Sequence, residues 1–450
     1  MAEDTTGILA KFAATLTYDQ LPERVRECTK GLLLDALTCA IAGHRGEETP
    51  QIAGLASAIA RSRESSVLGG ERSSLAGATL LNGYLITAVT MCDVYRPALT
   101  HITPEVVPPA LAIAERDDAS GRELLVALAV GMEVETRLGA SLNYPAFRRR
   151  GWHGPGVIGP FGAAAAVGHL IGLKPDRMAA AFGLAGSQAA GTFAAWGTPT
   201  VKFHQCRGAL SGLMAALLAQ QGFVATQQFL TVPDGGLYAA YTEGAHPEAA
   251  TEALGDRWEL EQIALRLWPA GSSIQGMITA MFDLVEKHNL RAENVAQLRI
   301  FLDRSIAEMH GMFPHYRAKF EALLSAHYIA AAILHDQELT LDQFEPQRYD
   351  DPRPRRFAAE RVKVLPDPRL SGVQSRVVVE TPDGRVLSSL CLVPKGSPEN
   401  PLSPAEIEGK FRRYAKGVLA PAKIDAAVEA VNHLEDLSST RTLMDALRSE

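Results

Sequence analysis

Apolar side chains recur every three or four positions through much of residues 1–266, which is the spacing of one face of a helix. Val25, Cys28 and Leu32 form one such stripe, which Gly43 ends. Small residues gather in 162–168 and again in 179–191, where they let neighbouring helices approach closely. Strand-like alternation is scarce in this part of the chain. The pattern therefore predicts a large all-helical domain over residues 1–266.

Several helix starts can be predicted from local signals. Ser120 with Glu123 has the spacing of a capping box. Pro108 and Pro109 favour the first turn of a helix over 107–115. Further along the chain, we expect helices to begin near Gly159 and near Arg207.

The pattern changes after Trp268. Residues 295–302 and 361–365 have the composition of strands, and 375–393 is divided by Pro382-Asp383-Gly384, a strong hairpin signal. Helical spacing returns after 398, where Ser403 and Glu406 form a second capping box. We therefore expect a mainly α protein: a large all-helical domain (1–266), a smaller α+β lid domain (267–398), and C-terminal helices (399–450) that pack back on the helical domain.

Composition excludes several classes of protein. The 450 residues have a formal net charge of -7 with both signs interspersed, which argues against nucleic acid as a partner. The five cysteines are scattered and form no C-x-x-C pair, which is typical of a reducing cytoplasm. The first ten residues do not have the basic and apolar parts of an export signal. The richest apolar stretch, 161–173, is too short to cross a bilayer, so we expect a buried helix there and no membrane association.

Common cofactor motifs are missing from the sequence. It has no P-loop, no G-x-G-x-x-G after a strand, no H-E-x-x-H and no G-x-S-x-G. We therefore expect an enzyme that uses no metal and no other cofactor.

Two residues stand in breaks between apolar helices. His153 lies in Gly151-Trp152-His153-Gly154-Pro155-Gly156, before a helix whose N-terminus would favour a carboxylate; the alternative is a histidine that caps a loop. Lys202 lies in Thr200-Val201-Lys202-Phe203-His204, where apolar surroundings suit it to pair with a carboxylate or to move protons. The alternative is an ordinary surface lysine.

Two further segments concentrate polar function. Asp93 and His101 flank a loop that contains Tyr95 and Arg96, although a solvated turn would also explain these residues. Just before the His153 loop, Tyr144 and Arg148 could supply a phenolic acid and a carboxylate clamp. A basic solvated turn explains this second pair equally well.

Taken in order, motifs along nearly the whole chain resemble the MmgE/PrpD family. The first group is Asn82-Gly83, Asp93, His101 and the Pro-Ala-Leu-Ala run at 109–112. The glycine-rich His153 loop follows, with the alanine-rich run at 161–166. The later landmarks are Lys202-Phe203-His204 with 211–219, Ser325-Ala326-His327-Tyr328, and Asn400-Pro401-Leu402-Ser403 with Lys410-Phe411.

The resemblance implies cofactor-free chemistry at a carbon next to a carboxylate, in a large helical domain with a smaller α+β lid. Cationic groups would hold the carboxylates while a base takes, or an acid returns, a proton. By position, Asp93, His101, His153, Lys202 and Tyr328 inherit these roles.

The sequence also departs from the family pattern. Dehydratases and decarboxylases of the family commonly have consecutive aspartates, but here Val94 follows Asp93, and Ile102 rather than proline follows His101. The family often has a histidine soon after Trp268-Pro269, where this chain has glycine, serines and Gln275. We expect Arg266, just upstream, to supply a cationic group. The family includes methylcitrate dehydratases and cis-aconitate decarboxylases, and the altered positions are among those that would position the extra carboxylate or the leaving hydroxyl in such enzymes.

Our leading interpretation is a lyase, a dehydratase or a decarboxylase, that acts on a small di- or tricarboxylate. The alternative is an epimerase of an amino- or iminodicarboxylate, such as iminodisuccinate, that uses two bases. A helical protein that only binds an acid is a third possibility. We expect a cytoplasmic homodimer in which His153 and Lys202 converge on one pocket between the helical domain and the lid. The predicted catalytic residues are His153, Lys202, Asp93, His101 and Tyr144, and the predicted substrate-binding residues are Arg148, Tyr95, Arg96, Tyr328, Arg266 and Gln275.

Overall fold

A computed structural model describes residues 4–311 and 315–449 and divides the chain into two compact units. Unit 1 comprises Met1–Ala264 and Ser403–Glu450, and unit 2 comprises Leu265–Leu402. In the described ranges, every helix is too short or too polar to cross a membrane. The expectation about an export signal rests in part on residues 1–3, which lie outside the described residues.

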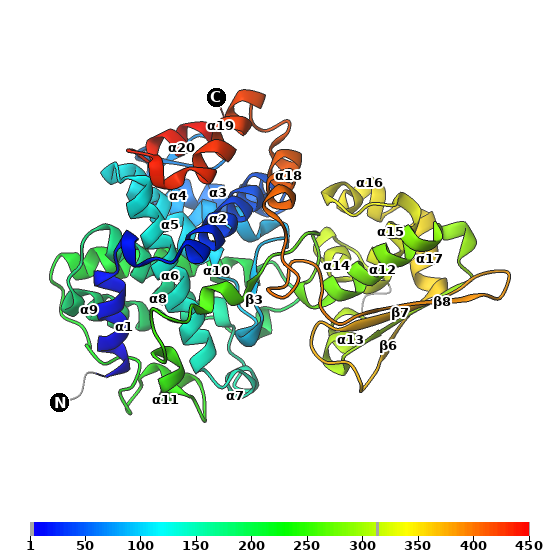
Figure 1. Cartoon of the computed structure of the whole chain (residues 1–450), viewed down its shortest axis with the longest axis horizontal. Coiled ribbons are helices and arrows are strands. Elements are labelled where there is room, and N and C mark those ends of the chain that lie inside the picture. The colour runs from blue at the N-terminus through cyan, green and yellow to red at the C-terminus, as the bar shows by residue number, and fades with distance from the viewer. Residues whose placement is uncertain (1–3, 312–314, 450) are drawn as a thin grey trace. The chain divides into compact units, whose positions relative to one another are not determined.

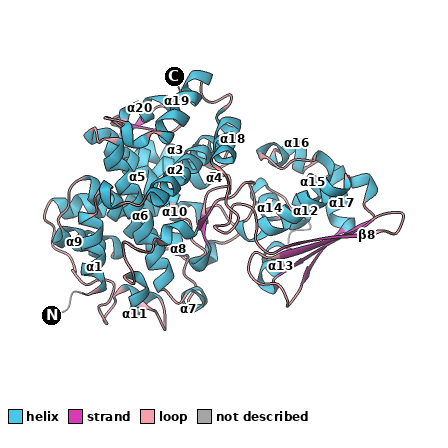
Figure 2. Ribbon diagram, viewed as in Figure 1, coloured by secondary structure: helices cyan, strands magenta, loops and turns pink. Residues whose placement is uncertain are grey.

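Unit 1 is helical apart from two short antiparallel strand pairs, β1–β2 (Ser65–Ser66, Arg72–Ser73) and β3–β4 (Val94–Tyr95, Ile263–Ala264) (Figures 1 and 2). Its helices are α1 (Thr5–Thr15), α2 (Glu23–Gly43), α3 (Thr49–Ile59), α4 (Leu75–Ala88), α5 (Thr103–Asp117), α6 (Gly121–Ser141), α7 (Tyr144–Arg149), α8 (Gly154–Leu170), α9 (Pro175–Gly186), α10 (Thr200–Gln220), α11 (Leu237–Tyr241), α18 (Pro404–Ala415), α19 (Pro421–Asn432) and α20 (Arg441–Ala446).

Helix α8 lies at the centre of unit 1, where it packs against α5, α6, α9 and α10. Every residue from Gly154 to Gly168 is buried. Small residues make this packing possible: a Cβ added at Gly212 of α10 would lie 2.3 Å from the Cβ of Ala163, closer than any packed pair can sit. The small-residue pattern in the sequence therefore marks the closest helix contacts.

The start of α5 differs from the prediction. The helix begins at Thr103, so Pro108 and Pro109 lie in its interior and not in its first turn. The carboxylate of Asp93 accepts hydrogen bonds from the backbone N–H groups of Ile102 (2.9 Å) and Thr103 (3.1 Å). Because these bonds satisfy donors that a helix N-terminus leaves open, the helix can start one turn earlier than Pro108 and Pro109 indicate, with Pro104 in its first turn.

Two other predicted helix starts were wrong in the same direction. Helix α8 begins at Gly154 rather than near Gly159, and α10 begins at Thr200 rather than near Arg207. Glycine and proline are tolerated in the first turn of a helix, so Gly154, Pro155 and Gly156 concealed the start of α8. For α10, Pro199 stands at the N-cap and marked the start that was missed. The capping boxes at Ser120 and Ser403 are confirmed.

Unit 2 contains a four-stranded sheet in the order β6-β5-β7-β8. Strands β5 (Gln297–Leu302) and β6 (Val362–Pro366) are parallel, while β7 (Ser375–Glu380) is antiparallel to β5 and to β8 (Val386–Cys391). The predicted turn joins β7 to β8, and Gly384 adopts a φ of +83° there. The helices of this unit are α12 (Gln275–His288), α13 (Arg304–His310), α14 (Lys319–Leu324), α15 (Ala326–Asp336), α16 (Pro346–Tyr349) and α17 (Pro352–Arg361).

The core of unit 2 is mostly aliphatic. Helix α12 packs on β7 and β8, and α15 contacts both α12 and α17. Met277, Ile278 and Met281 of α12 are fully buried, together with Leu298 and Ile300 of β5. The predicted fold class, a mainly α chain with an α+β second part, is confirmed.

Candidate functional site

The His153 loop is held in place by a neighbouring backbone segment. The N–H of His153 donates to the carbonyl of Gly191 at 3.0 Å, and the N–H of Phe193 donates to the carbonyl of Gly151 at 2.7 Å. These bonds pair residues 151–153 with 191–193. They place His153 at the position just before α8 begins.

His153 is in direct contact with a second histidine. Nδ1 of His153 lies 3.0 Å from Nδ1 of His204, which extends from the first turns of α10. Burial lowers the pKa of His153 to about 3, and the nearby His204, His101 and Arg148 act in the same direction. Burial also lowers the pKa of His204, assisted by the charge of Arg207. Both imidazoles are therefore neutral at physiological pH.

Arg148 reaches this pair through an aromatic ring. Its guanidinium carbon lies 3.2 Å from the centre of the Phe193 ring, and that ring meets the His153 ring edge-on at 5.9 Å. Burial lowers the pKa of Arg148, partly offset by Tyr144. Burial raises the pKa of Tyr144 to about 12, with Arg148 acting in the opposite direction. The structure thus gathers His153, His204, Phe193 and Arg148, with Tyr144 beside Arg148; we call these five residues the histidine cluster.

Asp93 has a clear structural task. Its buried carboxylate accepts hydrogen bonds from the backbone of Ile102 and from both the backbone and the hydroxyl of Thr103. Burial raises its pKa to about 6, although these bonds act in the opposite direction. A direct catalytic role of Asp93 stays a prediction.

His101 is oriented by the same loop. Its Nδ1 lies 2.6 Å from the backbone carbonyl of Asp93, and a carbonyl oxygen can only accept a hydrogen bond. Nδ1 therefore carries the proton, and in the neutral ring Nε2 keeps its lone pair. His101 is half-buried, and a positive charge on it would lower the pKa of His153. This tautomer suits His101 to accept a proton at Nε2.

Tyr95 and Arg96, the other two loop residues that the sequence predicted to bind substrate, differ in burial. Tyr95 is fully buried and donates its hydroxyl to Glu259 at 2.6 Å, which joins the loop to the segment before β4. Arg96 begins a short turn, Arg96–Ala98, and is half-buried. Their roles in substrate binding stay predictions.

Lys202 is paired within its own chain. Its Nζ donates to the carbonyl of Ala88 at 2.7 Å and lies 3.6 Å from a carboxylate oxygen of Glu48. The hydroxyl of Tyr84 donates to that same oxygen at 2.7 Å. Residues two positions apart on a helix project to different sides, so Lys202 and His204 leave α10 in different directions. The convergence of Lys202 with His153 stays a prediction.

Three predicted substrate-binding residues belong to unit 2, where each holds backbone. Tyr328 is buried and donates its hydroxyl to the carbonyl of Gln343. Arg266 donates to the carbonyl of Ala270 at 3.0 Å, and Gln275 donates to that of Trp268 at 3.2 Å. The roles of these three residues in substrate binding stay predictions.

Sequence reasoning missed His204 and Glu48, which contact His153 and Lys202. His204 stood in the quoted lysine motif but was not selected, although a histidine two positions after a candidate lysine was a usable signal. Glu48 had no signal at all in the sequence. Its importance follows only from the folding of the segment before α3 against α4 and α10.

Throughout residues 4–311 and 315–449, no three His, Cys, Asp or Glu side chains come together as a metal site would require. The independence from cofactors stays a prediction.

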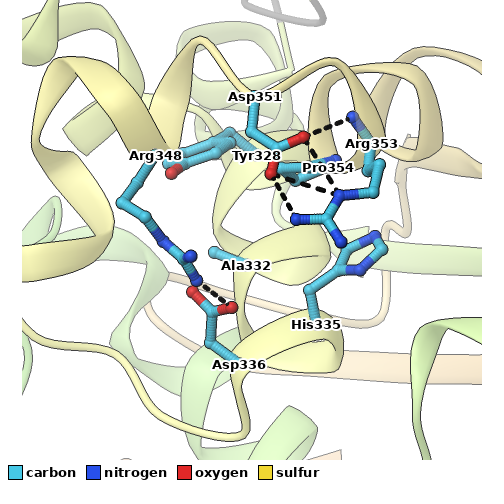
Figure 3. Close-up of a pocket in the computed structure, with 8 residues that line it drawn as sticks. All are labelled: Tyr328, Ala332, His335, Asp336, Arg348, Asp351, Arg353 and Pro354. Atoms are coloured by element: carbon cyan, nitrogen blue, oxygen red, sulfur yellow. Dashed lines mark hydrogen bonds and ion pairs between the residues drawn. The ribbon is translucent and has the colours of Figure 1, made fainter.

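Unit 2 has a small surface pocket of about 90 Å³, whose charged side chains pair with one another (Figure 3). Arg348 is paired with Asp336, and Arg353 lies 2.8 Å from Asp351. The pocket is lined by Tyr328, Ala332, His335, Asp336, Arg348, Asp351, Arg353 and Pro354.

Comparison with known proteins gives matches along the whole chain. The MmgE/PrpD N-terminal domain matches residues 7–250, and the MmgE/PrpD C-terminal domain matches residues 268–436. A cis-aconitate decarboxylase-like protein, oryM, of Aspergillus oryzae is 29% identical, over 99% of this chain and 98% of its own length. The cis-aconitate decarboxylase of Homo sapiens is 28% identical, over 100% and 95%, and that of Aspergillus terreus (strain NIH 2624 / FGSC A1156) is 27% identical, over 98% and 95%. The resemblance inferred from the motifs is confirmed, and the chain belongs to the MmgE/PrpD family.

Proposed function

We propose that this protein is a carboxy-lyase that removes carbon dioxide from a small unsaturated polycarboxylate of the cis-aconitate type. The observation that carries the proposal is the similarity to cis-aconitate decarboxylases over 98% or more of the chain. The buried neutral histidines and the nearby cations supply chemistry that fits such a substrate.

Cations would hold the substrate carboxylates. Arg148, set over the Phe193 ring, offers a planar guanidinium that suits a carboxylate. Lys202 already has a carboxylate partner in Glu48, so a substrate carboxylate would compete for the same ammonium group. In a buried place such contacts are stronger than in water.

His101 is the group that we assign to proton transfer. In decarboxylation the bond from the substrate to the leaving carboxylate breaks, carbon dioxide departs, and the electron pair stays on the substrate. One proton must then return to carbon. His101 can take that proton from solvent on Nε2 and deliver it, because the backbone of Asp93 occupies its Nδ1–H.

Product analysis tests the proposal. Purified protein incubated with cis-aconitate should release one carbon dioxide for each five-carbon unsaturated dicarboxylate formed, as measured by NMR and gas release. Release of water from a hydroxylated tricarboxylate would instead assign a dehydratase. Solvent deuterium entering a stereocentre without loss of mass would assign the epimerase. Binding of carboxylates without turnover of any of them would leave only a binding protein.

Three further expectations accompany the proposal. Chelator treatment should leave activity unchanged, and activity lost to chelator and restored by a metal would contradict the expected independence from cofactors. Light scattering at micromolar concentration should give the mass of a homodimer. Fractionation of the source cells should place the protein in the cytoplasm.

A further inference from the structure

The contact between His153 and His204 has a chemical consequence. A neutral imidazole has one N–H donor and one lone pair. Since Nδ1 faces Nδ1 at 3.0 Å, one of these two nitrogens must carry a proton and the other must not. The two rings therefore have opposite tautomers. The hydrogen-bond contact of the His153 ring with the described residues is made through Nδ1, so Nε2 is the nitrogen that remains for a ligand.

The fold fixes the position of His204 from several sides. Gly191 has a φ of +131°, and a Cβ there would lie 3.0 Å from Nδ1 of His204. Arg207, one turn further along α10, donates to the carbonyls of Gly156 and Ala190, each at 2.8 Å. These bonds hold the start of α8 and the 190–193 segment against α10. The two rings are thus built into a fixed geometry.

We propose that His204 is a positioning residue that donates its Nδ1–H to Nδ1 of His153 and thereby keeps the proton of His153 on Nε2. The direction of donation rests on the proposed function, because the expected ligand is an anion. With Nε2 protonated, His153 offers a donor to a carboxylate oxygen. The opposite tautomer would direct a lone pair at the same oxygen and repel it.

The burial of His153 makes the tautomer matter. With a pKa of about 3, caused chiefly by burial, the ring does not become an imidazolium at neutral pH. It cannot then bind a carboxylate as a cation and must do so through its single N–H. The partner on Nδ1 therefore decides whether His153 can bind the substrate at all.

Two substitutions at position 204 separate the possible arrangements. In His204→Asn the side-chain amide still donates from nearly the place of Nδ1 and should preserve the tautomer of His153. In His204→Asp the carboxylate can only accept, so it should move the proton of His153 to Nδ1. His169→Asn is the matched control, because His169 lies in the last turn of α8, where its Nδ1 donates to the carbonyl of Ala13.

The first readout needs no activity. Nitrogen NMR of protein labelled with 15N-histidine distinguishes protonated from unprotonated ring nitrogens, and His153 can be assigned by loss of its signals in His153→Gln. We expect Nδ1 of His153 to be unprotonated in the native protein and in His204→Asn, and protonated in His204→Asp. A native His153 with its proton on Nδ1, or with the proton divided evenly, would overturn the proposal.

The second readout is turnover of cis-aconitate. His204→Asp should lower kcat/KM by about 10- to 100-fold, the usual cost of losing a partner that orients a functional imidazole. His204→Asn should recover most of it, and His169→Asn should match the native protein. Equal losses in the Asn and Asp variants would contradict a role in setting the tautomer. If no carboxylate is turned over, the proposed function fails, and the nitrogen spectra still decide the tautomer.

Discussion

Charged side chains meet in two very different regions of this molecule. In the interior of unit 1, Lys410 of α18 lies 2.5 Å from Asp35 of α2, and the two side chains are 2% and 1% exposed. At the pocket of unit 2, Arg353 lies 2.8 Å from Asp351, but its side chain is 77% exposed (Figure 3). Each pair joins a cationic side chain to an aspartate, and the two pairs differ mainly in their access to water.

Because the two ion pairs differ in burial, they contribute differently to the stability of the protein. Water screens the pair at the pocket, so it contributes little, while the interior pair is costly to break. The arginines and aspartates of the pocket also cancel one another, which leaves no net charge to attract an anion. The imidazoles of the histidine cluster, by contrast, are buried and neutral. The burial of a charged or titratable group therefore decides which substitutions we expect to matter.

The largest stability effect should come from breaking the interior pair. Lys410→Met leaves Asp35 buried without its cation and should lower the free energy of unfolding by about 3–5 kcal/mol. Burial by itself would lower the pKa of Lys410, but Asp35 outweighs burial and raises it. Denaturant unfolding measures the loss. Asp35→Leu combined with Lys410→Met should recover most of it, and a double variant as unstable as the single one would contradict this account.

Substitution of the two candidate site residues should affect turnover more than stability. Lys202→Ala and His153→Ala should each lower kcat/KM by about 10²-fold or more, because we propose that each residue contacts the substrate. His153→Ala should leave the melting temperature nearly unchanged, whereas Lys202→Ala should also lower it, because the carbonyl of Ala88 and the carboxylate of Glu48 lose their partner. Two folded variants with near-native turnover of the true substrate would refute the site assignment.

The pH dependence of stability should reveal the buried His153. Its pKa falls from the ordinary 6.5 to about 3, chiefly through burial, so between these values the unfolded chain binds a proton that the folded chain does not. Its contribution is complete above pH 6.5 and is lost as the pH falls towards 3. From pH 7 to 5, His153→Asn should lose about 2 kcal/mol less than the native protein does.

A smaller loss of stability should follow from Asp93→Ala. The change leaves the backbone donors of Ile102 and Thr103 without their acceptor, at a cost of about 1–2 kcal/mol. Asp93→Asn keeps one acceptor oxygen and should be less harmful. If Asp93→Asn keeps its melting temperature but loses turnover, Asp93 acts in the chemistry as well as in the fold.

The sequence predicted the broad architecture because helix and strand periodicities survive in buried segments. Local signals of other kinds also helped: the small-residue runs at 162–168 and 179–191 mark segments of α8 and α9, and the turn at 382–384 joins β7 to β8. The sequence misplaced the start of α5 because a tertiary contact stabilises that start. Asp93 stabilises the start of α5 from ten positions upstream, and no local pattern reveals that bond.

The site was predictable only in part for a related reason. His153 and Lys202 stand out by their glycine and apolar neighbours, which a sequence displays directly. Their partners do not: His204 is 51 positions from His153, and Glu48 comes from a segment with no special composition. Hydrogen-bond partners of functional groups depend on the packing of distant helices. For the same reason, sequence could not show that Tyr95 and Asp93 are engaged by their own chain.

The smallest effect is expected at the pocket of unit 2. Arg353→Ala removes an exposed partner of Asp351, so it should change neither kcat/KM nor, measurably, the melting temperature. Arg148→Ala is the matched change in unit 1, where the guanidinium lies over a ring that touches His153, and it should raise KM. The two variants are compared on one substrate under one set of conditions. A loss of kcat/KM in Arg353→Ala as large as that in Arg148→Ala would show that exposed, paired charge can serve the reaction, and the distinction drawn from burial would fail.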